Sequence, residues 1–86
     1  MLEQTLIELA DLFREHGEVA TAEALKNMAS DVSDRLPGRV LDMFTHGMGG
    51  IYDAALYRDG ELDREATSRR KELGEQLYRE ATARLK

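Results

Sequence analysis

Apolar side chains recur at every third or fourth position near the start of the chain, and this spacing limits the fold more than any other feature of the sequence. The members of this stripe are Leu2, Leu6, Leu9 and Phe13. Such a spacing places them on one side of an α-helix, while polar and acidic residues fill the other side. The pattern predicts a helix from Leu2 to about His16, ended by Gly17 in a left-handed conformation.

A second apolar stripe predicts a helix from about Glu18 to Arg35. Its members are Ala22, Leu25, Ala29, Val32 and Leu36. Pro37-Gly38 is expected to break the chain after this helix, because proline disfavours helical geometry in the residue before it. An alternative is a separate short helix that begins at Ser30-Asp31. Residues 39–46 carry enough apolar side chains for two further helical turns.

Three glycines in four positions predict a turn at residues 47–50, because glycine is costly inside a regular element. The glycines are Gly47, Gly49 and Gly50. The next stretch, Ile51 to Tyr57, fits either a short helix or a strand, and its alanines and the lack of a second strand candidate favour a helix. A polar turn over residues 58–61 follows.

The last part of the chain predicts a long helix with Asp63 as its N-cap. The residues that line one face are Ala66, Leu73, Leu77 and either Ala81 or Arg84. Three acid–base pairs spaced by four residues support this helix. The pairs are Glu65–Arg69, Glu75–Arg79 and Glu80–Arg84.

Together these elements predict an all-α protein: a compact bundle of four or five antiparallel helices, with the glycine-rich turn at 47–50, in a single domain over residues 1–86. A chain of 86 residues has room for one hydrophobic core. It contains no cysteine, which excludes disulfides, thiolate nucleophiles and cysteine-bound zinc. No signal-peptide pattern and no apolar run of about 18 residues is present, so we expect a cytoplasmic location and no membrane span.

The two histidines, His16 and His46, each stand directly before a glycine at a predicted helix end. A side chain that donates hydrogen bonds suits the free carbonyl groups of a last helical turn. No spacing typical of metal ligands accompanies them, and no set of nucleophile, base and orienting group can be assembled from the sequence. We therefore expect no metal site, no cofactor and no catalytic residues.

Acidic residues are concentrated in the first part of the chain. The formal net charge is −5; residues 1–36 hold eight acidic residues against three basic ones, whereas residues 37–86 hold nine of each. This balance argues against nucleic acid, which needs a basic surface, and favours a basic protein as the partner. The candidate contacts on the polar side of the first helix are Glu8, Asp11 and Glu15. The candidate anchors around the glycine turn are Met48, Tyr52 and Tyr57.

Asp53 and Arg70 are candidates for a structural role beside the glycine turn. Asp53 stands among apolar neighbours three residues after Gly50, where a carboxylate can accept hydrogen bonds from free backbone amides. Arg70 falls on the same stripe as Leu73 and Leu77, which predicts a half-buried side chain that pairs with Asp53.

Residues 47–56 read Gly-Met-Gly-Gly-Ile-Tyr-Asp-Ala-Ala-Leu. This run resembles the Gly-Met-Gly-Ser-Leu-Asn-Asp-Leu signature of a small bacterial helical family, and the similarity extends over roughly residues 36–86. Gly50 replaces the serine and Tyr52 the asparagine, so the resemblance does not carry over a polar site. Members of that family often occur near polymorphic toxins, which implies an immunity role for some of them.

The main hypothesis is an immunity or antitoxin-like protein that binds and neutralises a toxin domain through an acidic helical surface. The alternative is a structural or adaptor domain, for instance a homodimer formed through the leucine face of the final helix. Both a monomer and a homodimer remain open. An enzyme is a weaker hypothesis, since no catalytic set of residues can be assembled. A DNA-binding regulator is also weaker, since the basic residues at 64–71 are diluted by neighbouring acids.

Overall fold

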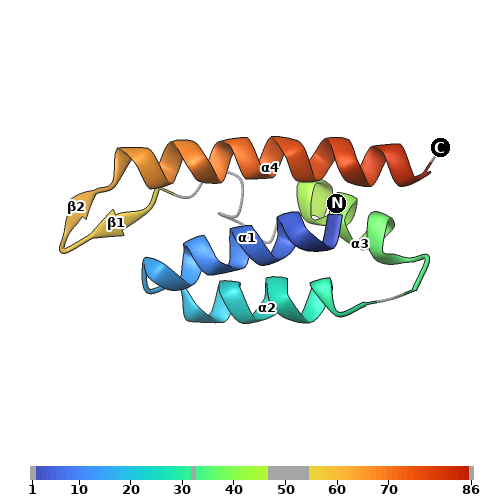
Figure 1. Ribbon diagram of the computed structural model, residues 1–86, viewed down its shortest axis with the longest axis horizontal. Helices are drawn as coiled ribbons and strands as arrows, with labels where there is room; N and C mark the ends of the chain where they lie inside the picture. Colours follow the sequence, from blue (N-terminus) through green and yellow to red (C-terminus); the bar gives the residue numbers. More distant parts are fainter. Residues whose placement is uncertain (1, 32, 47–54, 86) are drawn as a thin grey trace.

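The computed structural model describes residues 2–31, 33–46 and 55–85, and within them the chain is mostly helical. The elements are α1 (Leu2–Glu15), α2 (Val19–Ala29), α3 (Leu36–His46), β1 (Tyr57–Arg58), β2 (Glu61–Leu62) and α4 (Arg64–Leu85). These four helices form a compact globule that extends 41 × 22 × 19 Å (Figure 1). The expectation of a helical protein is confirmed, and the two short strands are an addition to it.

Helix α1 lies between α2 and α4 and packs against both, while α3 packs against α4 (Figure 1). The chain runs in one direction through α1 and in the opposite direction through α2 and α4. With 22 residues, α4 is long enough to span α1 and to reach the β-hairpin. The hairpin extends from the end of the molecule where α1 turns into α2 (Figure 1).

Every member of the α1 stripe is buried, as the spacing predicts. The three leucines expose 0% of their surface and Phe13 exposes 2%. The same core contains Ala22, Leu25 and Met28 of α2, Leu36, Val40 and Met43 of α3, and Ala66, Leu73, Leu77 and Ala81 of α4. Burying one such leucine contributes roughly 1.5–3 kcal/mol, so this stripe is a principal source of the stability of the fold.

The predicted end of α1 is confirmed. Gly17 has a φ of 82°. Its N–H donates to the Arg14 carbonyl at 3.1 Å, and the N–H of Glu18 donates to the Phe13 carbonyl at 2.9 Å. This pair of hydrogen bonds is the Schellman motif, which satisfies carbonyl groups of the last turn when a residue with positive φ follows the helix.

The second helix is shorter than predicted, because it ends at Ala29 and not at Arg35. Asp31 accepts a hydrogen bond from the Ser33 N–H at 2.8 Å, and the Ser33 hydroxyl oxygen accepts one from the Arg35 N–H at 3.2 Å. Such local side-chain bonds compete with helical bonds. A separate helix starting at Ser30 is also absent from the described residues of this connection.

The prediction that Pro37-Gly38 breaks the chain is wrong. Both residues lie in the first turn of α3, which begins at Leu36. The first backbone N–H groups of a helix have no helical acceptor, so a proline there removes no hydrogen bond of the helix. The helical bonding continues at once, since the Arg39 N–H donates to the Arg35 carbonyl at 3.0 Å.

Residues 57–62 form a β-hairpin, which corrects the expectation that Tyr57 ends a short helix. Tyr57 pairs with Leu62 and Arg58 with Glu61. The two residues between them, Asp59 and Gly60, have φ values of 53° and 81°. Positive φ at both positions defines a type I′ turn, for which Asp-Gly is a preferred sequence. The predicted polar turn is thus confirmed, and two-residue strands are too short to stand out in the sequence.

Alanine substitutions at Gly17 and Gly38 measure the cost of a left-handed backbone without steric clashes. An added Cβ atom meets no heavy atom within 4 Å at either position. Of the two, Gly17 alone has a positive φ. We expect Gly17→Ala to lower the free energy of unfolding by about 1–2 kcal/mol. Gly38→Ala should raise it by about 0.5 kcal/mol, because alanine favours helix. Urea denaturation measures both changes, and equal effects would contradict the assignment.

Candidate functional site

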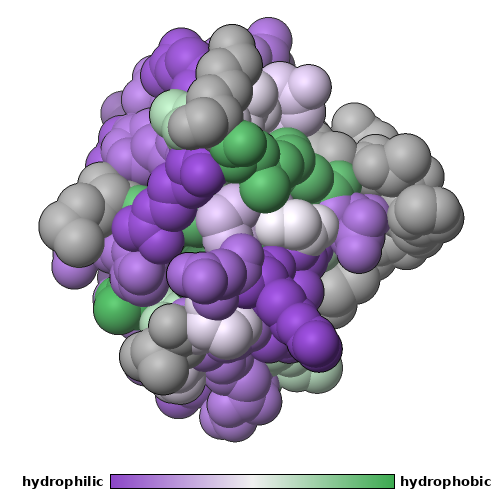
Figure 2. Space-filling view, turned by 90° about the vertical axis from the view of Figure 1, so that its right-hand side faces the viewer, coloured by the Kyte–Doolittle hydropathy of each residue, from purple (hydrophilic) through white to green (hydrophobic). Residues whose placement is uncertain are grey.

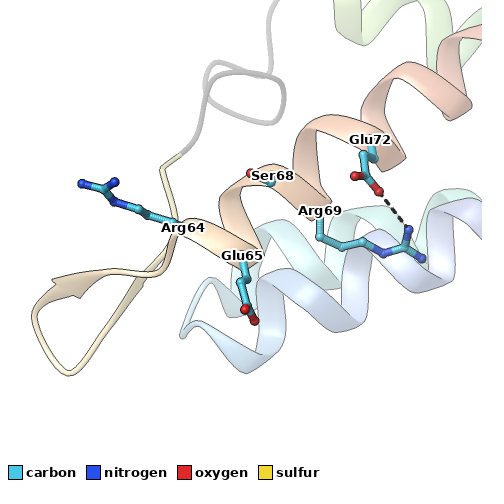
Figure 3. Close-up of a pocket in the computed structure, with 5 residues that line it drawn as sticks. All are labelled: Arg64, Glu65, Ser68, Arg69 and Glu72. Carbon is cyan, nitrogen blue, oxygen red and sulfur yellow. Dashed lines mark hydrogen bonds and ion pairs between the residues drawn. The ribbon is translucent and has the colours of Figure 1, made fainter.

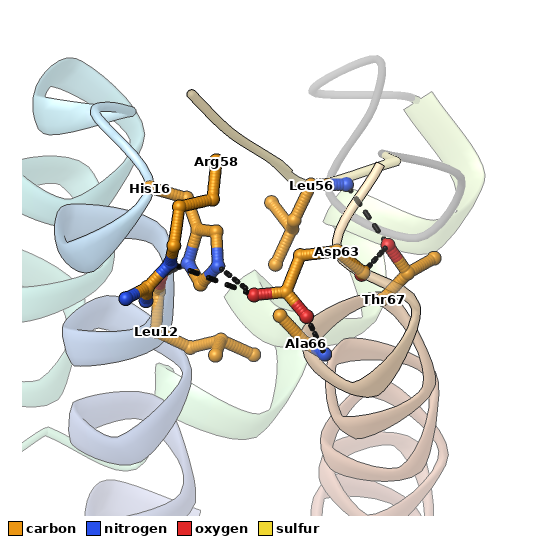
Figure 4. Close-up of polar contacts among 7 residues, drawn as sticks. All are labelled: Leu12, His16, Leu56, Arg58, Asp63, Ala66 and Thr67. Carbon is orange, nitrogen blue, oxygen red and sulfur yellow. Dashed lines mark hydrogen bonds and ion pairs between the residues drawn. The ribbon is translucent and has the colours of Figure 1, made fainter. Parts of the chain in front are cut away.

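His16 is enclosed at the end of α1, beside the junction of β2 and α4 (Figure 4). Its side chain exposes 2% of its surface. The ring Nδ1 lies 2.9 Å from the Leu12 carbonyl oxygen, which confirms the expected contact with a helix-end carbonyl. The ring Nε2 lies 2.9 Å from Oδ2 of Asp63, a contact across 47 positions that the sequence did not predict.

Both ring nitrogens of His16 therefore face oxygen atoms that accept hydrogen bonds. A neutral imidazole has one N–H group and satisfies one of them, whereas the imidazolium ion satisfies both. The Asp63 carboxylate and, to a smaller extent, the Leu12 carbonyl raise the pKa of His16 above its ordinary value. The hydrogen bond from His16 in turn lowers the pKa of Asp63.

Asp63 connects three parts of the molecule (Figure 4). Its Oδ1 accepts a hydrogen bond from the Ala66 N–H at 3.0 Å, which confirms the predicted N-cap of the final helix. Its Oδ2 faces His16 and also lies 3.7 Å from Nε of Arg58 in β1. One carboxylate thus joins α1, the hairpin and the first turn of α4.

Three hydrogen bonds fasten the hairpin to α4 (Figure 4). The Asp63 N–H donates to the Leu56 carbonyl at 2.8 Å, and the Leu56 N–H donates to the Thr67 hydroxyl oxygen at 3.0 Å. The Thr67 hydroxyl then donates to the Asp63 carbonyl at 2.8 Å. The hairpin and the first turn of α4 are consequently one unit.

This geometry gives His16 a structural role. A general base must reach the proton of a substrate, and the ring of His16 is enclosed with both nitrogens occupied. Over residues 2–31, 33–46 and 55–85, no group of three histidine, aspartate or glutamate side chains is arranged to hold a metal ion. The side chain of His46 lies outside the described part of the chain.

Three shallow surface hollows that share lining residues lie along the hairpin, α4 and the flank of α1, and their combined lining is referred to below as the acidic groove. It is lined by Glu8, Asp11, Leu12 and Glu15 of α1, by Arg58, Asp59, Glu61, Leu62 and Asp63 around the hairpin, and by Arg64, Glu65, Ser68, Arg69, Glu72 and Leu73 of α4. Arg64 and Glu65 line both the hollow at the hairpin and the hollow on α4. Arg69 lines both the hollow on α4 and the hollow beside α1. Figure 3 shows Glu65 and Arg69 directed toward the side on which α1 lies, and Arg64 directed away.

The charge of the acidic groove equals that of the whole chain. Its lining holds eight acidic and three basic side chains, a formal charge of −5. The entire chain also carries −5, so the remaining residues balance to zero. The sequence places the excess acid in residues 1–36, whereas the folded surface combines part of it with acids from residues 59–72.

The three acids predicted on the polar side of α1 all line this groove, but they differ in their partners. Glu8 lies 3.9 Å from Arg69, and Asp11 lies 3.6 Å from Lys26. Within the described residues, no ion pair involves Glu15. The local pairing predicted for Arg69 is replaced, because its guanidinium contacts Glu8 and Glu72.

Arg84 similarly leaves its predicted partner for one on another helix. It forms two hydrogen bonds to the carboxylate of Glu3, which connects the last turn of α4 to the first turn of α1. Farther along the same two helices, the buried Thr5 hydroxyl donates to Glu80 and accepts from Gln76 at 3.2 Å. These contacts between α1 and α4 have no signal in the sequence, since helical periodicity describes one helix at a time.

The remaining candidate residues have different outcomes. Tyr57 is 56% exposed on the hairpin, directly opposite Leu62, which is 46% exposed. Arg70 exposes 6% of its surface, so it is buried more deeply than the predicted half-buried side chain. The other predicted residues, Gly47, Met48, Gly49, Gly50, Tyr52 and Asp53, lie outside the described residues. The proposed pairing of Asp53 with Arg70 and the turn at 47–50 therefore remain predictions.

The opposite end of the molecule shows a different surface. Figure 2 shows a short apolar strip there, bordered by hydrophilic side chains. A hollow of about 310 Å³ at the same end is lined by Glu3, Asp31, Ser33, Asp34, Pro37 and Arg84. Hydrogen bonds from Ser33 and Arg39 lower the pKa of Asp31 to about 2. The acids of this hollow are thus largely engaged within the chain, so we place the candidate site at the acidic groove.

The leucine face of α4, expected as a homodimer interface, is occupied within the chain. Leu73 and Leu77 expose 1% and 0% of their surface. Among the described residues, no helix has the length and apolar character needed to cross a membrane. The fold and its groove define a small helical protein with a β-hairpin. No protein-family model matches the sequence, and no curated protein or solved structure shows significant similarity to it.

The His16–Asp63 pair predicts how stability depends on pH. Because the folded state raises the pKa of His16, the stability it adds is complete below its ordinary value of about 6.5 and is lost as the pH rises through the folded pKa. We therefore expect the free energy of unfolding to fall as the pH rises above about 6.5. His16→Gln should be less stable at pH 6 and lose this decline. An equal decline in both proteins, measured by urea denaturation, would assign it to other groups.

Two threonines of α4 test the fastening of the hairpin. Thr67 and Thr82 each donate a hydrogen bond to the carbonyl four residues earlier, but Thr67 also accepts one from the Leu56 N–H. Thr67→Val leaves that N–H without its acceptor, so we expect a loss of about 1–2 kcal/mol in the free energy of unfolding. Thr82→Val should change it by less than about 0.5 kcal/mol. Similar losses in the two variants would contradict the role of Thr67.

Proposed function

We propose that this protein is an immunity- or antitoxin-like inhibitor that binds a basic toxin domain through the acidic groove. The observation that supports it is the concentration of the formal charge of the chain in one groove between α1, the hairpin and α4. The resemblance of residues 47–56 to a family found near toxins points in the same direction. On this proposal the protein acts by occupying its partner's cleft, without catalysis.

Electrostatics explains how such a partner is selected. Toxin domains that attack nucleic acids or nucleotides need positive clefts, and an acidic surface steers toward such a cleft during diffusional encounter. Glu15 and Glu65, which both line the groove, have no ion pair within the described residues. Their carboxylates are therefore ready to meet cations of a partner. Glu8 and Asp11 would have to exchange Arg69 and Lys26 for the partner's cations.

The hairpin carries two exposed apolar side chains that can contact a partner beside the charged residues. Tyr57 and Leu62 face each other across the two strands, and both are about half exposed. Directly opposed residues of an antiparallel pair project on the same face of the sheet. This tyrosine–leucine pair stands at one end of the acidic groove, since Leu62 is one of its lining residues. An aromatic anchor surrounded by charged contacts is the usual composition of a tight protein interface.

Co-expression with the product of a neighbouring gene tests the proposal. We expect that product to arrest growth by itself and the arrest to be relieved by this protein. The double variant Glu15→Gln/Glu65→Gln should bind about three- to tenfold more weakly at low salt, because each exposed charge pair is worth roughly 0.2–1 kcal/mol. Most of this loss should appear in the association rate, measured by stopped-flow mixing, and should shrink as salt is added.

The matched control removes the same amount of charge elsewhere. Asp34 and Asp42 are exposed, and neither lines the acidic groove. Asp34→Asn/Asp42→Asn should therefore bind at the wild-type rate. If both double variants slow association equally, net charge and not the groove steers binding. If neighbouring products neither arrest growth nor bind, the proposed function is wrong.

A further inference from the structure

We propose that His16 is a proton-operated latch that holds the hairpin end of α4 against the end of α1, so that a loss of its proton frees the hairpin from α1 and weakens binding of a basic partner at the acidic groove. The latch itself follows from the fold. Only the last step, weaker binding, rests on the proposed function.

The ring of His16 contacts one residue of α1 and one residue at the junction of β2 and α4. Leu12, whose carbonyl faces Nδ1, lines the groove from α1. Asp63, whose carboxylate faces Nε2, lines it from the junction of β2 and α4. Within the described residues, no other hydrogen bond or ion pair joins residues 55–67 to α1. His16 thus supplies the polar contact between α1 and this end of α4, where Leu56 and Ala66 are buried in the core.

A change at Asp63 moves the hairpin as a unit. The hydrogen bonds among Leu56, Asp63 and Thr67 connect both ends of the hairpin to the first turn of α4. The exposed pair Tyr57 and Leu62 belongs to the same unit. Separation of Asp63 from His16 therefore displaces the apolar anchor relative to the acids of α1.

The charged groups around the ring explain why its proton controls the contact. Asp63 attracts the imidazolium ion, and Arg58 of β1, which also lies beside Asp63, opposes it. From α1 the ring meets the Leu12 carbonyl. Within the described residues, α2 and α3 contribute no hydrogen bond or ion pair to it. After deprotonation, one ring nitrogen presents a lone pair to an oxygen in either tautomer, and the attraction between opposite charges is lost in both.

Amide hydrogen exchange between pH 5.5 and 8.5 tests the latch without any partner. Protection factors, which correct for the intrinsic effect of pH, should fall by about tenfold for the amides of residues 57–62 as the His16 ring loses its proton. The ring is followed by NMR in the same samples. Protection that stays constant while the ring titrates would overturn the latch.

Asp63→Asn and Glu61→Gln form a matched pair of variants. Asparagine is also a good N-cap, so Asp63→Asn keeps the start of α4 while removing the charge that His16 contacts. We expect it to show low hairpin protection at every pH. Glu61→Gln removes an exposed acid of the same hairpin and should keep the wild-type profile. An Asp63→Asn profile identical to that of the wild type would contradict the latch.

A ten-residue peptide of alternating arginine and alanine serves as a basic probe for the last step. Its affinity for the wild type should fall by about three- to tenfold from pH 5.5 to 8.5, and its affinity for Asp63→Asn should not change with pH. Affinity independent of pH, together with pH-dependent protection, would overturn the control of binding. A peptide that binds at no pH would contradict the proposed function of the groove, while the exchange data still decide on the latch.

Discussion

The apolar stripe of α1 is shared between two helices that come from different parts of the chain: α2 follows it directly, and α4 comes last. Its leucines and Phe13 are almost completely buried. The chain contains no cysteine, so these helices are held together without disulfides, mainly by hydrophobic burial. The part of the groove beside α1 is a consequence of this arrangement, because it is lined by α1 and α4 residues that flank the shared core.

Ion pairs at the two ends of the α1–α4 contact have different weights. Glu3 and Arg84 remain about one third exposed, and such pairs contribute at most about 1 kcal/mol. His16 is enclosed, and removing its partner would leave one ring nitrogen without its hydrogen-bond partner. The first pair sets the alignment of two helices, while the second also fixes the position of the hairpin. The enclosed ion pair of the described residues therefore lies where the N-cap of α4 meets the end of α1.

Helical periodicity predicted most of the fold, because α1 and α4 each bury one continuous stripe. It failed where short-range bonds decide the outcome: Asp31 and Ser33 end α2 early, and Pro37 fits a first turn. The strands were missed because the Asp59-Gly60 turn has only two residues on each side. The acids of α1 lie on its polar side, as its periodicity predicts. The role of Asp63 as partner of His16 was not predicted, since a contact across 47 positions leaves no local pattern.

The position of α4 has a consequence for the protein while it is being made. When a ribosome has released α1 and α2, these helices can already pair, but the flank of α1 that faces α4 still lacks its cover. Leu73, Leu77 and Ala81, which complete the core, emerge only after α1, α2 and α3 have left the ribosome. Until then the nascent chain exposes leucine to its surroundings, a condition in which chaperone binding and self-association compete with folding. Slowing translation within the α4 codons would prolong this interval.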